Sequence, residues 1–362
     1  MKIAFYLPRV YYHPGGGAKI VLEYANYLAS KGNEIFIYYH NPSISFRSNS
    51  DIKHTIKICA DYCIGKLFGC SKWFDLNQNV EERIISNAFE IEPCDVVVAT
   101  AIQLVESVLN LPSQYKKKVY LIQGYETWEF SEDRIISIYQ KSKNNIVISK
   151  WLETIVDGNS NQKSYLIPNF IDDNVFFCSN RNRDPHSLTF HYRSASIKGG
   201  KYGIDVINRL YSLYPDIKVK IVTTEKKLPR LPACCELYTN IKPGEVALIN
   251  NSCEVFMCTT IEEGFGLPGL EAMACGCALA TTNYAAVYDY ADDNYNALIS
   301  PIKDVDAMVS NIVKLFEDSE LRDTISRNAI ITAKKRSKQE TFKLVEKYFY
   351  DLAGEVRDVP NY

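Results

Sequence analysis

Short apolar runs alternate along this chain with longer segments in which apolar residues recur every three or four positions. The run Lys2–Val10 comes first, and a glycine-containing loop and a helical segment separate it from a second run, Glu34–Tyr39. In the helical segment Val21, Ala25 and Leu28 fall on one face. A strand, a helix and a second strand in this order predict a βαβ unit, which implies a parallel sheet.

The same alternation continues through the first half of the chain. Further strands are predicted at Ile52–Ile58, Asp95–Thr100, Val119–Gln123 and Asn145–Ser149. Helices are predicted at Val80–Phe89, Gln103–Leu109, Glu132–Lys141 and Lys150–Asp157. This pattern is typical of one doubly wound α/β domain.

A second α/β domain is predicted after the polar stretch Ser179–Ser187. Its strands are predicted at Leu188–Tyr192, Lys218–Thr223, Glu254–Cys258, Ala278–Thr282 and Ala297–Ile299. Its helices are predicted at Tyr202–Tyr214 and from Val305 onward, with a last helix that includes Gln339–Leu352. We therefore expect an N-terminal domain over residues 1–178, a C-terminal domain over 187–338 and a terminal helical segment over 339–362.

The composition is that of a globular chain. Its 362 residues are enough for two domains that each bury a core, and 46% of them are hydrophobic, which excludes a disordered protein. The net charge of −2 gives no support for nucleic-acid binding.

The 11 cysteines show no paired short spacing that combines with histidines. Cys59, Cys63 and Cys70 come closest to a cluster, but no histidine or fourth cysteine completes a metal site. Scattered thiols favour a reducing cytoplasm over a disulfide framework. We expect neither a secretion signal nor a transmembrane helix, because the first residues enter a strand directly and no apolar run reaches about 18 residues.

The segment that begins at Glu263 places two carboxylates around a glycine turn that opens a helix. Gly264 and Gly266 allow backbone N–H groups to approach a ligand closely, and Pro268 suits the first helical position. A helix N-terminus binds anions, phosphate above all. Glu263 precedes this anion site and Glu271 lies about one turn inside the helix. The pattern indicates a nucleotide-sugar site, and a surface loop that leads into an ordinary helix is the alternative.

This segment resembles the Glu-x7-Glu motif of retaining glycosyltransferases with the GT-B fold, in particular glycosyltransferase family 4. In that family the first glutamate lies near the donor sugar and the second binds the ribose, which the resemblance carries over to Glu263 and Glu271. The resemblance also implies two Rossmann-like doubly wound domains that face each other across a cleft. The N-terminal domain would be the acceptor side and the C-terminal domain the donor side, with the last helix packed back on the N-terminal domain. The residues whose N–H groups would hold the diphosphate and the sugar are Gly264, Phe265, Gly266 and Leu267.

Two cations, Arg193 and Lys198, follow the first strand of the second predicted domain, and with Gly199 they resemble the family's Arg-x4-Lys-Gly element. A departing nucleoside diphosphate gains negative charge, so fixed cations stabilise the transition state more than the ground state. Arg193 can bind phosphate oxygens with its rigid fork, while Lys198 acts as a mobile point charge. The alternative is a pair of solvated cations in a loop.

The glycines Gly15, Gly16 and Gly17 lie between the first strand and the first helix. Their N–H groups can reach the crevice where open α/β sheets place ligands. A nicotinamide cofactor is excluded, because the spacing is not Gly-x-Gly-x-x-Gly and the second strand ends in Tyr39-His40 without an acidic residue. By resemblance this loop packs against the donor phosphates and the acceptor, and a flexible turn is the alternative.

The sequence Gln123–Trp128 follows a predicted strand and resembles a variant seen in rhamnosyltransferase-like members of family 4. Gln123, Tyr125 and Glu126 are candidates for contacts with donor or acceptor hydroxyls, and a structural turn with a buried tyrosine fits as well. None of the five histidines is predicted at this point. By resemblance, a retaining transferase can use the leaving phosphate as its base.

A peripheral membrane contact is a further candidate. The stretch Ile64–Phe74 mixes aromatic residues with Lys66 and Lys72, and Lys116–Lys118 adds basic charge. Such a face would suit a lipid-linked acceptor. A loop packed on the first domain is the alternative.

The resemblance implies a retaining, metal-independent glycosyltransferase without a cofactor. Its co-substrate would be a dTDP-, UDP- or GDP-sugar, and its acceptor a saccharide or lipid-linked glycan in surface polysaccharide biosynthesis. Its place would be the cytoplasm, at the inner face of the membrane if it binds membranes. Two alternatives stay open: a GT-B-type nucleotide-sugar epimerase or phosphorylase, and a non-catalytic partner subunit of a transferase.

Overall fold

The computed structural model describes residues 1–11, 15–41, 70–179 and 182–354, and it divides the chain into two compact units. The first unit comprises Met1–Ile167 and Phe342–Tyr362, and the second comprises Pro168–Thr341. The second unit thus begins before the polar stretch Ser179–Ser187, at which we expected the boundary. The strand predicted at Ile52–Ile58 lies outside the described residues.

The first unit is built on a parallel sheet of seven strands in the order β3-β2-β1-β4-β5-β6-β7. The strands are β1 (Lys2–Leu7), β2 (Glu34–His40), β3 (Val80–Ile85), β4 (Val96–Ala99), β5 (Lys117–Ile122), β6 (Asn145–Val147) and β7 (Tyr165–Leu166). The chain order reverses at β1, which is the Rossmann arrangement. Its central strands are buried on both faces, as a doubly wound sheet requires.

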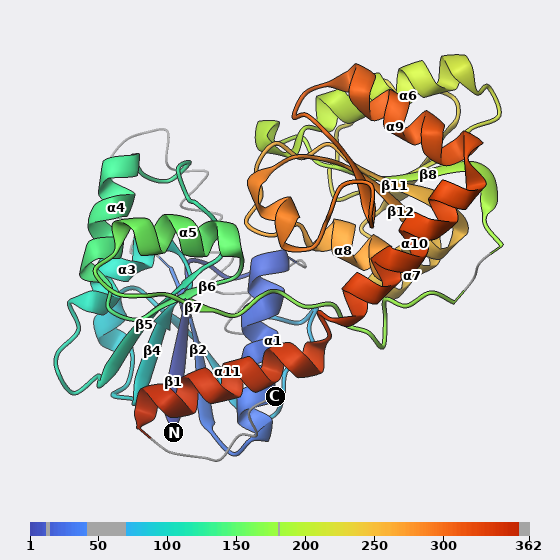
Figure 1. Cartoon of the computed structure of the whole chain (residues 1–362). Helices are drawn as coiled ribbons and strands as arrows, with labels where there is room; N and C mark the ends of the chain where they lie inside the picture. The colour runs from blue at the N-terminus through green and yellow to red at the C-terminus, as the bar shows by residue number, and fades with distance from the viewer. Residues whose placement is uncertain (12–14, 42–69, 180–181, 355–362) are drawn as a thin grey trace. The chain divides into compact units, whose positions relative to one another are not determined.

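The helices of the first unit confirm most of the predicted ones. They are α1 (Gly16–Ser30), α3 (Ile102–Leu109), α4 (Glu132–Lys141), α5 (Lys150–Asn159) and most of α11 (Lys338–Ala353), with a short η1 (Ala88–Glu90). Figure 1 shows α11 beside α1, where the rings of Phe342 and Tyr27 stack with centroids 4.5 Å apart. Glu346 of α11 also accepts a hydrogen bond of 2.5 Å from the hydroxyl of Tyr27.

The helix predicted at Val80–Phe89 is wrong, because its first six residues form the edge strand β3. β3 pairs in parallel with β2, from Ile35 opposite Val80 to His40 opposite Ile85. Its apolar residues Val80, Ile84 and Ile85 fall at helical spacing by accident, and edge strands commonly carry charges between them. Partners far away in the sequence hold them: the hydroxyl of Tyr39 donates to Glu82 at 2.7 Å. Tertiary pairing therefore overrides the local pattern.

The second unit repeats the arrangement with six parallel strands in the order β10-β9-β8-β11-β12-β13. The strands are β8 (Asp184–Tyr192), β9 (Lys218–Thr223), β10 (Cys235–Thr239), β11 (Cys253–Cys258), β12 (Ala278–Thr282) and β13 (Ala297–Ser300). The chain order reverses at β8. The two strands that flank the reversal, β8 and β11, are direct neighbours, so the loops that follow them meet at one edge of the sheet.

The helices of the second unit cover both faces of its sheet (Figure 1). They are α6 (Gly200–Leu213), α7 (Pro243–Ser252), α8 (Leu267–Ala274), α9 (Val305–Glu317) and α10 (Ser319–Lys334), with short η2 (Ser196–Lys198) and η3 (Ala285–Asp289). Phe190 and Met257 of the sheet pack with Ile207 of α6 and Ile312 of α9 in one buried cluster. The sequence interpretation missed β10, which is largely exposed, and α7, whose apolar residues do not form a clear stripe.

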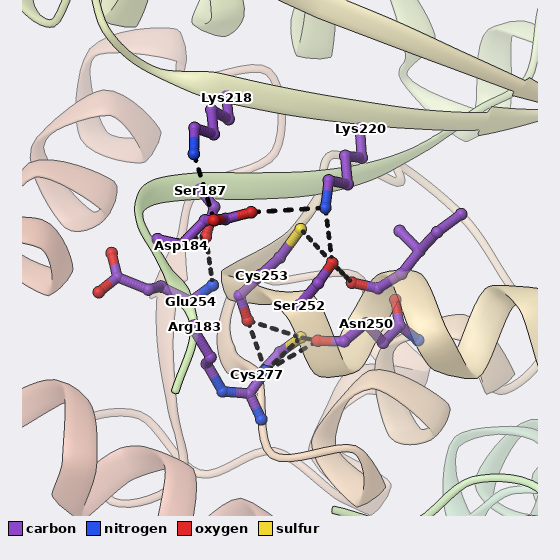
Figure 2. Close-up of polar contacts among 11 residues, drawn as sticks. Arg183, Asp184, Ser187, Lys218, Lys220, Asn250, Ser252, Cys253, Glu254 and Cys277 are labelled. Atoms are coloured by element: carbon purple, nitrogen blue, oxygen red, sulfur yellow. Dashed lines mark hydrogen bonds and ion pairs between the residues drawn. The ribbon is translucent and has the colours of Figure 1, made fainter. Parts of the chain in front are cut away.

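A polar network holds the amino ends of the strands in the second unit (Figure 2). The guanidinium of Arg183 donates to the backbone carbonyls of Asn250 at 2.8 Å, Cys253 at 2.5 Å and Cys275 at 2.6 Å. These carbonyls lie at or just beyond the C-terminal ends of α7 and α8, where a cation is favoured. Because the network lies at the end of the sheet away from the loops after β8 and β11, we assign it a structural role.

Candidate functional site

The site in the second unit is built from the loops after β8 and β11. The backbone N–H groups of Ile261 and Glu262 donate to the carbonyl of Ile197, at 2.8 and 3.1 Å. The hydroxyl of Thr259 donates to the carbonyl of Gly199 at 2.9 Å. These bonds bring the predicted basic loop and the predicted glycine turn together.

Close packing of the two loops depends on a pair of glycines. Gly199 has a φ of +65°, and a Cβ atom there would lie 1.8 Å from the carbonyl oxygen of Thr259. A Cβ on Gly200 would lie 2.4 Å from the carbonyl oxygen of Arg193. No other residue type fits either position without moving backbone, which is the physical reason for glycine after Lys198.

Two predicted site residues, Lys198 and Glu263, are in contact. The Nζ of Lys198 lies 3.1 Å from Oε1 of Glu263, and the two side chains are 29% and 26% exposed. The ion pair is accessible from solvent, and the lysine side chain is mobile. An incoming anion could therefore compete with Glu263 for the ammonium group. The two charges also hold each other in position.

Arg193 lies beside this pair and is half-buried. Its guanidinium donates to the carbonyl of Tyr192 at 2.8 Å. Burial lowers the pKa of Arg193, while the carboxylates of Glu225 and Glu263 act in the opposite direction. An arginine remains charged throughout. The site therefore holds two cations and a carboxylate that faces both of them.

The predicted glycine turn leads into α8, whose first residue is Leu267, so Pro268 takes the second helical position and not the first. Gly266 has a φ of +100° and caps the helix. Across the part of the chain that the structure describes, the N–H groups of Gly264, Phe265, Gly266 and Leu267 have no hydrogen-bond partner. These free donors at a helix N-terminus make an anion site.

Two tyrosines that the sequence interpretation missed support this turn. The hydroxyl of Tyr290 donates to the carbonyl of Gly266 at 3.0 Å and lies 2.5 Å from the hydroxyl of Tyr284. A Cβ on Gly266 would lie 2.0 Å from the Tyr284 hydroxyl. The ring of Phe265 is buried against Tyr290, with centroids 5.6 Å apart. Phe265 can therefore contact a ligand only through its backbone.

Glu271 lies in the second turn of α8 and is partly exposed. Its charge contributes to the raised pKa of the Cys275 thiol, for which burial is the main cause. The structure thus places Glu263 just before the turn and Glu271 on the helix that follows, as the sequence spacing requires.

The first unit has its own pocket, with a volume of 380 Å³, at the carboxyl ends of β1, β4 and β5. Gly15, Gly16 and Gly17 line one side of it, and Gln123 and Glu126 line another. The remaining lining residues are Leu7, Pro8, Arg9, Tyr11, Ala18, Val21, Thr100, Ala101, Gln103, Gly124, Trp128 and Glu129. Residues 12–14 of the predicted glycine loop lie outside the described part of the chain.

The third candidate in this segment, Tyr125, is not among the lining residues. Its hydroxyl donates to Glu132 at 2.7 Å, and its ring meets that of Trp151 edge to face. We therefore regard Tyr125 as structural and keep Gln123 and Glu126 as ligand contacts.

Gln123 and the glycine loop are packed together. A Cβ on Gly17 would lie 3.2 Å from the amide atoms of Gln123, so this glycine leaves room for the side chain. Gly16, by contrast, faces open space. The Oε1 of Gln123 is buried and has no partner among the described residues, which is unusual for a buried polar atom.

Glu126 is a largely buried carboxyl group with one committed oxygen. The hydroxyl of Tyr120 and the N–H of Ile102 donate to its Oε2, at 2.5 and 2.9 Å. Ile102 begins α3, so Glu126 also caps that helix. Burial raises the pKa of Glu126 to about 7, against the effect of these two hydrogen bonds. Near neutral pH the group is therefore partly protonated.

Two of the histidines that the structure describes, His191 and His40, are neutral. Burial lowers the pKa of His191, on β8, to about 3. His40 ends β2, its Nδ1 lies 2.7 Å from the hydroxyl of Tyr6, and burial lowers its pKa as well. Neither is a proton acceptor that the site presents to a ligand, because both rings are turned into the protein.

The basic residues proposed for a membrane face have local partners. Lys116 forms an ion pair with Asp95 at 2.7 Å, and the ammonium of Lys118 donates to the carbonyls of Leu109 and Leu111 at the end of α3. The indole N–H of Trp73 donates to the carbonyl of Tyr11 at 2.5 Å. Residues 64–69 of the stretch Ile64–Phe74 lie outside the described residues. These contacts favour the alternative, a loop packed on the first unit.

Within the described ranges no three or more His, Cys, Asp or Glu side chains are grouped so that they could hold a metal ion. The chain does contain one Asp-x-Asp pair, Asp304 and Asp306. Asp304 caps α9 by accepting from the N–H of Ala307 at 2.9 Å, and Asp306 pairs with Arg209. Both carboxylates thus already make contacts that belong to the fold. None of the described helices is long and apolar enough to span a membrane.

Comparison with known proteins relates part of the chain to a family. The family whose model matches residues 177–332 is described as Glycosyl transferases group 1. The match includes the basic loop, the glycine turn and α8. It does not include the pocket of the first unit.

Two relatives match parts of the chain. An uncharacterized glycosyltransferase of Methanocaldococcus jannaschii is 23% identical over 216 residues, which are 58% of this chain and 59% of that protein. The N,N'-diacetylbacillosaminyl-diphospho-undecaprenol alpha-1,3-N-acetylgalactosaminyltransferase of Campylobacter jejuni is 28% identical over 107 residues, 27% of this chain and 28% of that protein. The chain thus spans less than two thirds of the length of either relative.

Among solved structures, the Anabaena protein HepE in complex with UDP-glucose resembles the whole chain. Its TM-score is 0.71 at 14% identity, and the alignment covers 98% of this chain and 100% of that one. At this identity the likeness concerns the fold. The predicted fold class, two Rossmann-like units of the GT-B type, is confirmed.

Proposed function

We propose that this protein, whose residues 177–332 belong to the Glycosyl transferases group 1 family, moves a sugar from a nucleotide-diphosphate-sugar to an acceptor. The observation that carries the proposal is the meeting of the Lys198–Glu263 pair with the free N–H groups that open α8. Cations and N–H donors suit a diphosphate, and carboxylates suit the hydroxyls of sugar and ribose.

Arg193, Lys198 and the N–H groups of residues 264–267 would bind the diphosphate of the donor. As the bond between the sugar and the diphosphate breaks, negative charge grows on the leaving oxygen. Donors held in place by packed loops stabilise that charge without reorganisation, and this lowers the barrier. The glycine pair Gly199–Gly200 and the tyrosine pair Tyr284–Tyr290 would keep these donors in place.

Glu263 would orient the donor sugar and stabilise the positive charge that develops at its anomeric carbon. Its contact with Lys198 supports this, because a lysine drawn toward the diphosphate releases the carboxylate for the sugar. Glu271 would bind the ribose. The resemblance to family 4 favours retention of the anomeric configuration and a reaction without a metal ion.

Gly16, Gly17, Gln123 and Glu126 would bind the donor or the acceptor from the first unit, where they line one pocket. The acceptor would be a saccharide or a lipid-linked glycan, as the printed name of the Campylobacter jejuni relative suggests for that protein. Surface polysaccharide assembly in the cytoplasm is the setting we favour, and the described cysteines are all free, as in a reducing compartment.

The donor would be a UDP-, dTDP- or GDP-sugar. UDP-glucose binds the structurally similar HepE, while the Gln123–Trp128 segment favours a rhamnosyl donor. Thermal unfolding of the full chain with each nucleotide-sugar tests the proposal, because a ligand of the folded state raises the melting temperature. A donor that stabilises the wild type and not Lys198→Ala supports it, and no shift with any donor contradicts it. Turnover of that donor without any saccharide acceptor would indicate an epimerase.

A further inference from the structure

We propose that Trp128 is the platform on which a sugar ring of the acceptor rests, so that the pocket of the first unit takes a neutral saccharide and not a phosphate. This inference rests on the proposed function, since it names the acceptor chemistry of that reaction. It concerns a residue to which neither the sequence motif nor the family match assigns a role.

Trp128 is an aromatic side chain left in contact with solvent at the pocket. It lines the pocket and is 58% exposed, although tryptophan is normally among the well-buried residues. A Cβ on Gly124 would lie 3.1 Å from Cη2 of Trp128, so the ring rests against the bare backbone of Gly124. Glycine at 124 thus lets the indole lie over the start of its own loop. The result is a positioned apolar surface that the fold itself does not cover.

The polar groups around the pocket are of the kind that sugar hydroxyls match. The Oε1 of Gln123 is buried without a partner among the described residues. Both hydrogen bonds to Glu126 end on Oε2, so its Oε1 is available to the pocket. A hydroxyl both donates and accepts, whereas a phosphate only accepts, and a lone carbonyl oxygen needs a donor. A pyranose has hydroxyls at its edge and C–H groups on its face, which suit these oxygens and the indole respectively.

The charges of the pocket point to the same ligand class. Arg9 is the one lysine or arginine among the described lining residues, and its guanidinium lies over the Tyr11 ring at 5.2 Å. Two carboxyl groups, Glu126 and Glu129, share the pocket with it. In the second unit, by contrast, Arg193 and Lys198 stand together beside free N–H groups. We therefore assign the diphosphate to the second unit and the acceptor sugar to this pocket.

Saturation-transfer difference NMR of the full chain tests the inference. The probes are the methyl glycosides of glucose, galactose, rhamnose and N-acetylglucosamine, with inorganic pyrophosphate as the competing anion. We expect at least one glycoside to bind, and Trp128→Ala to weaken its binding about tenfold. Trp128→Phe should restore most of the affinity. Phe89→Ala, which removes an exposed aromatic ring elsewhere in the first unit, is the matched control and should bind like the wild type.

Three results would overturn the inference: no glycoside binds, Trp128→Ala binds as well as the wild type, or pyrophosphate displaces the glycoside. In a separate experiment, the melting temperature of the protein is measured with UDP, dTDP or GDP added. A nucleotide that still stabilises the protein while no glycoside binds would reject this inference and leave the proposed function standing. If none of the three nucleotides raised the melting temperature, the proposed function would be rejected instead.

Discussion

The ammonium of Lys198 lies 3.1 Å from the carboxylate of Glu263, although one residue follows β8 and the other follows β11. The contact exists because these strands are neighbours in the sheet and their loops are tied at Ile197 and Thr259. When an anionic donor draws Lys198 toward its diphosphate, the carboxylate of Glu263 is released at the same time. The first prediction follows from this pair.

Lys198→Ala should lower kcat/KM for the donor about a hundredfold or more, because it removes a charge that stabilises the leaving diphosphate. Steady-state kinetics with the donor found by thermal unfolding measures this. Lys201→Ala is the matched control, since Lys201 is an exposed lysine on the neighbouring helix α6. Equal rates for Lys198→Ala and Lys201→Ala would show that Lys198 has no role in the reaction.

Gly266→Ala should destabilise the second unit by about 2 kcal/mol or more, because the residue has a positive φ and no room beside Tyr284. Urea unfolding gives the difference. Gly244→Ala is the control, because nothing lies within 4 Å of a Cβ there and the residue begins α7. A Gly266→Ala protein as stable as the wild type would show that the turn is not held as described.

The free energy of unfolding should depend on pH through Glu126. Its folded pKa, about 7, is above the ordinary value of 4.5, so between these pH values the folded state holds a proton that the unfolded state has lost. The stability of the wild type therefore falls as pH rises through this window. Compared with Glu126→Gln, the wild type should lose about 3 kcal/mol of its free energy of unfolding once the pH is above 7.

Urea unfolding of wild type and Glu126→Gln from about pH 4 to about pH 8 measures this difference. The amide keeps an oxygen that can accept from Tyr120 and Ile102, so the cap of α3 is retained. Glu129→Gln, an exposed carboxylate of the same loop, is the control. A difference between wild type and Glu126→Gln that does not change with pH would rule out a raised pKa.

Arg183→Met should destabilise the protein by about 3 kcal/mol, since it removes the charged donor to the carbonyls of Asn250, Cys253 and Cys275. The thiol of Cys277 still donates to the first two, but more weakly. Because this network lies at the amino ends of the strands, the affinity for the donor should be unchanged at a temperature where the variant is folded. Arg327→Met is the control, as the exposed Arg327 reaches only its neighbour Thr324. A changed donor affinity at full folding would contradict the structural role.

Chelation should leave the transfer rate unchanged, because Arg193 and Lys198 supply the positive charge that a divalent cation would otherwise provide. The measurement is kcat/KM before and after dialysis against EDTA. A rate that falls with EDTA and returns with added magnesium or manganese would show that the reaction needs a metal ion.

Much of the fold could be predicted from the sequence, because buried parallel strands and amphipathic helices leave a local pattern. The strands at Lys218–Thr223 and Ala278–Thr282 and the helix at Glu132–Lys141 are found with the predicted bounds. The pattern failed at Val80–Ile85, where the spacing of the apolar residues resembles that of a helix and only pairing with β2 makes a strand. It also failed at the exposed strand β10.

The candidate site divides in the same way. Glycines, paired carboxylates and a basic loop at given spacings are readable along the chain, so Arg193, Lys198, Glu263 and Glu271 could be named from the sequence. Tyr284 and Tyr290 could not, because their role depends on hydroxyl groups that meet under Gly266. For Tyr125 the sequence leaves a ligand contact and a structural role open, and its contacts with Glu132 and Trp151 favour the structural role.

The sequence by itself determined that this protein alternates strands and helices in two parallel-sheet units and carries a glycine turn before a helix, which suits an anion. Those properties follow from hydrophobic period and from backbone preferences, which act over a few residues. Only the tertiary structure decided that Lys198 meets Glu263, that Glu126 is half-buried with one oxygen committed, and that Trp128 stays exposed over Gly124. These contacts depend on which strands are neighbours in the sheet, and packing across the whole unit determines that order.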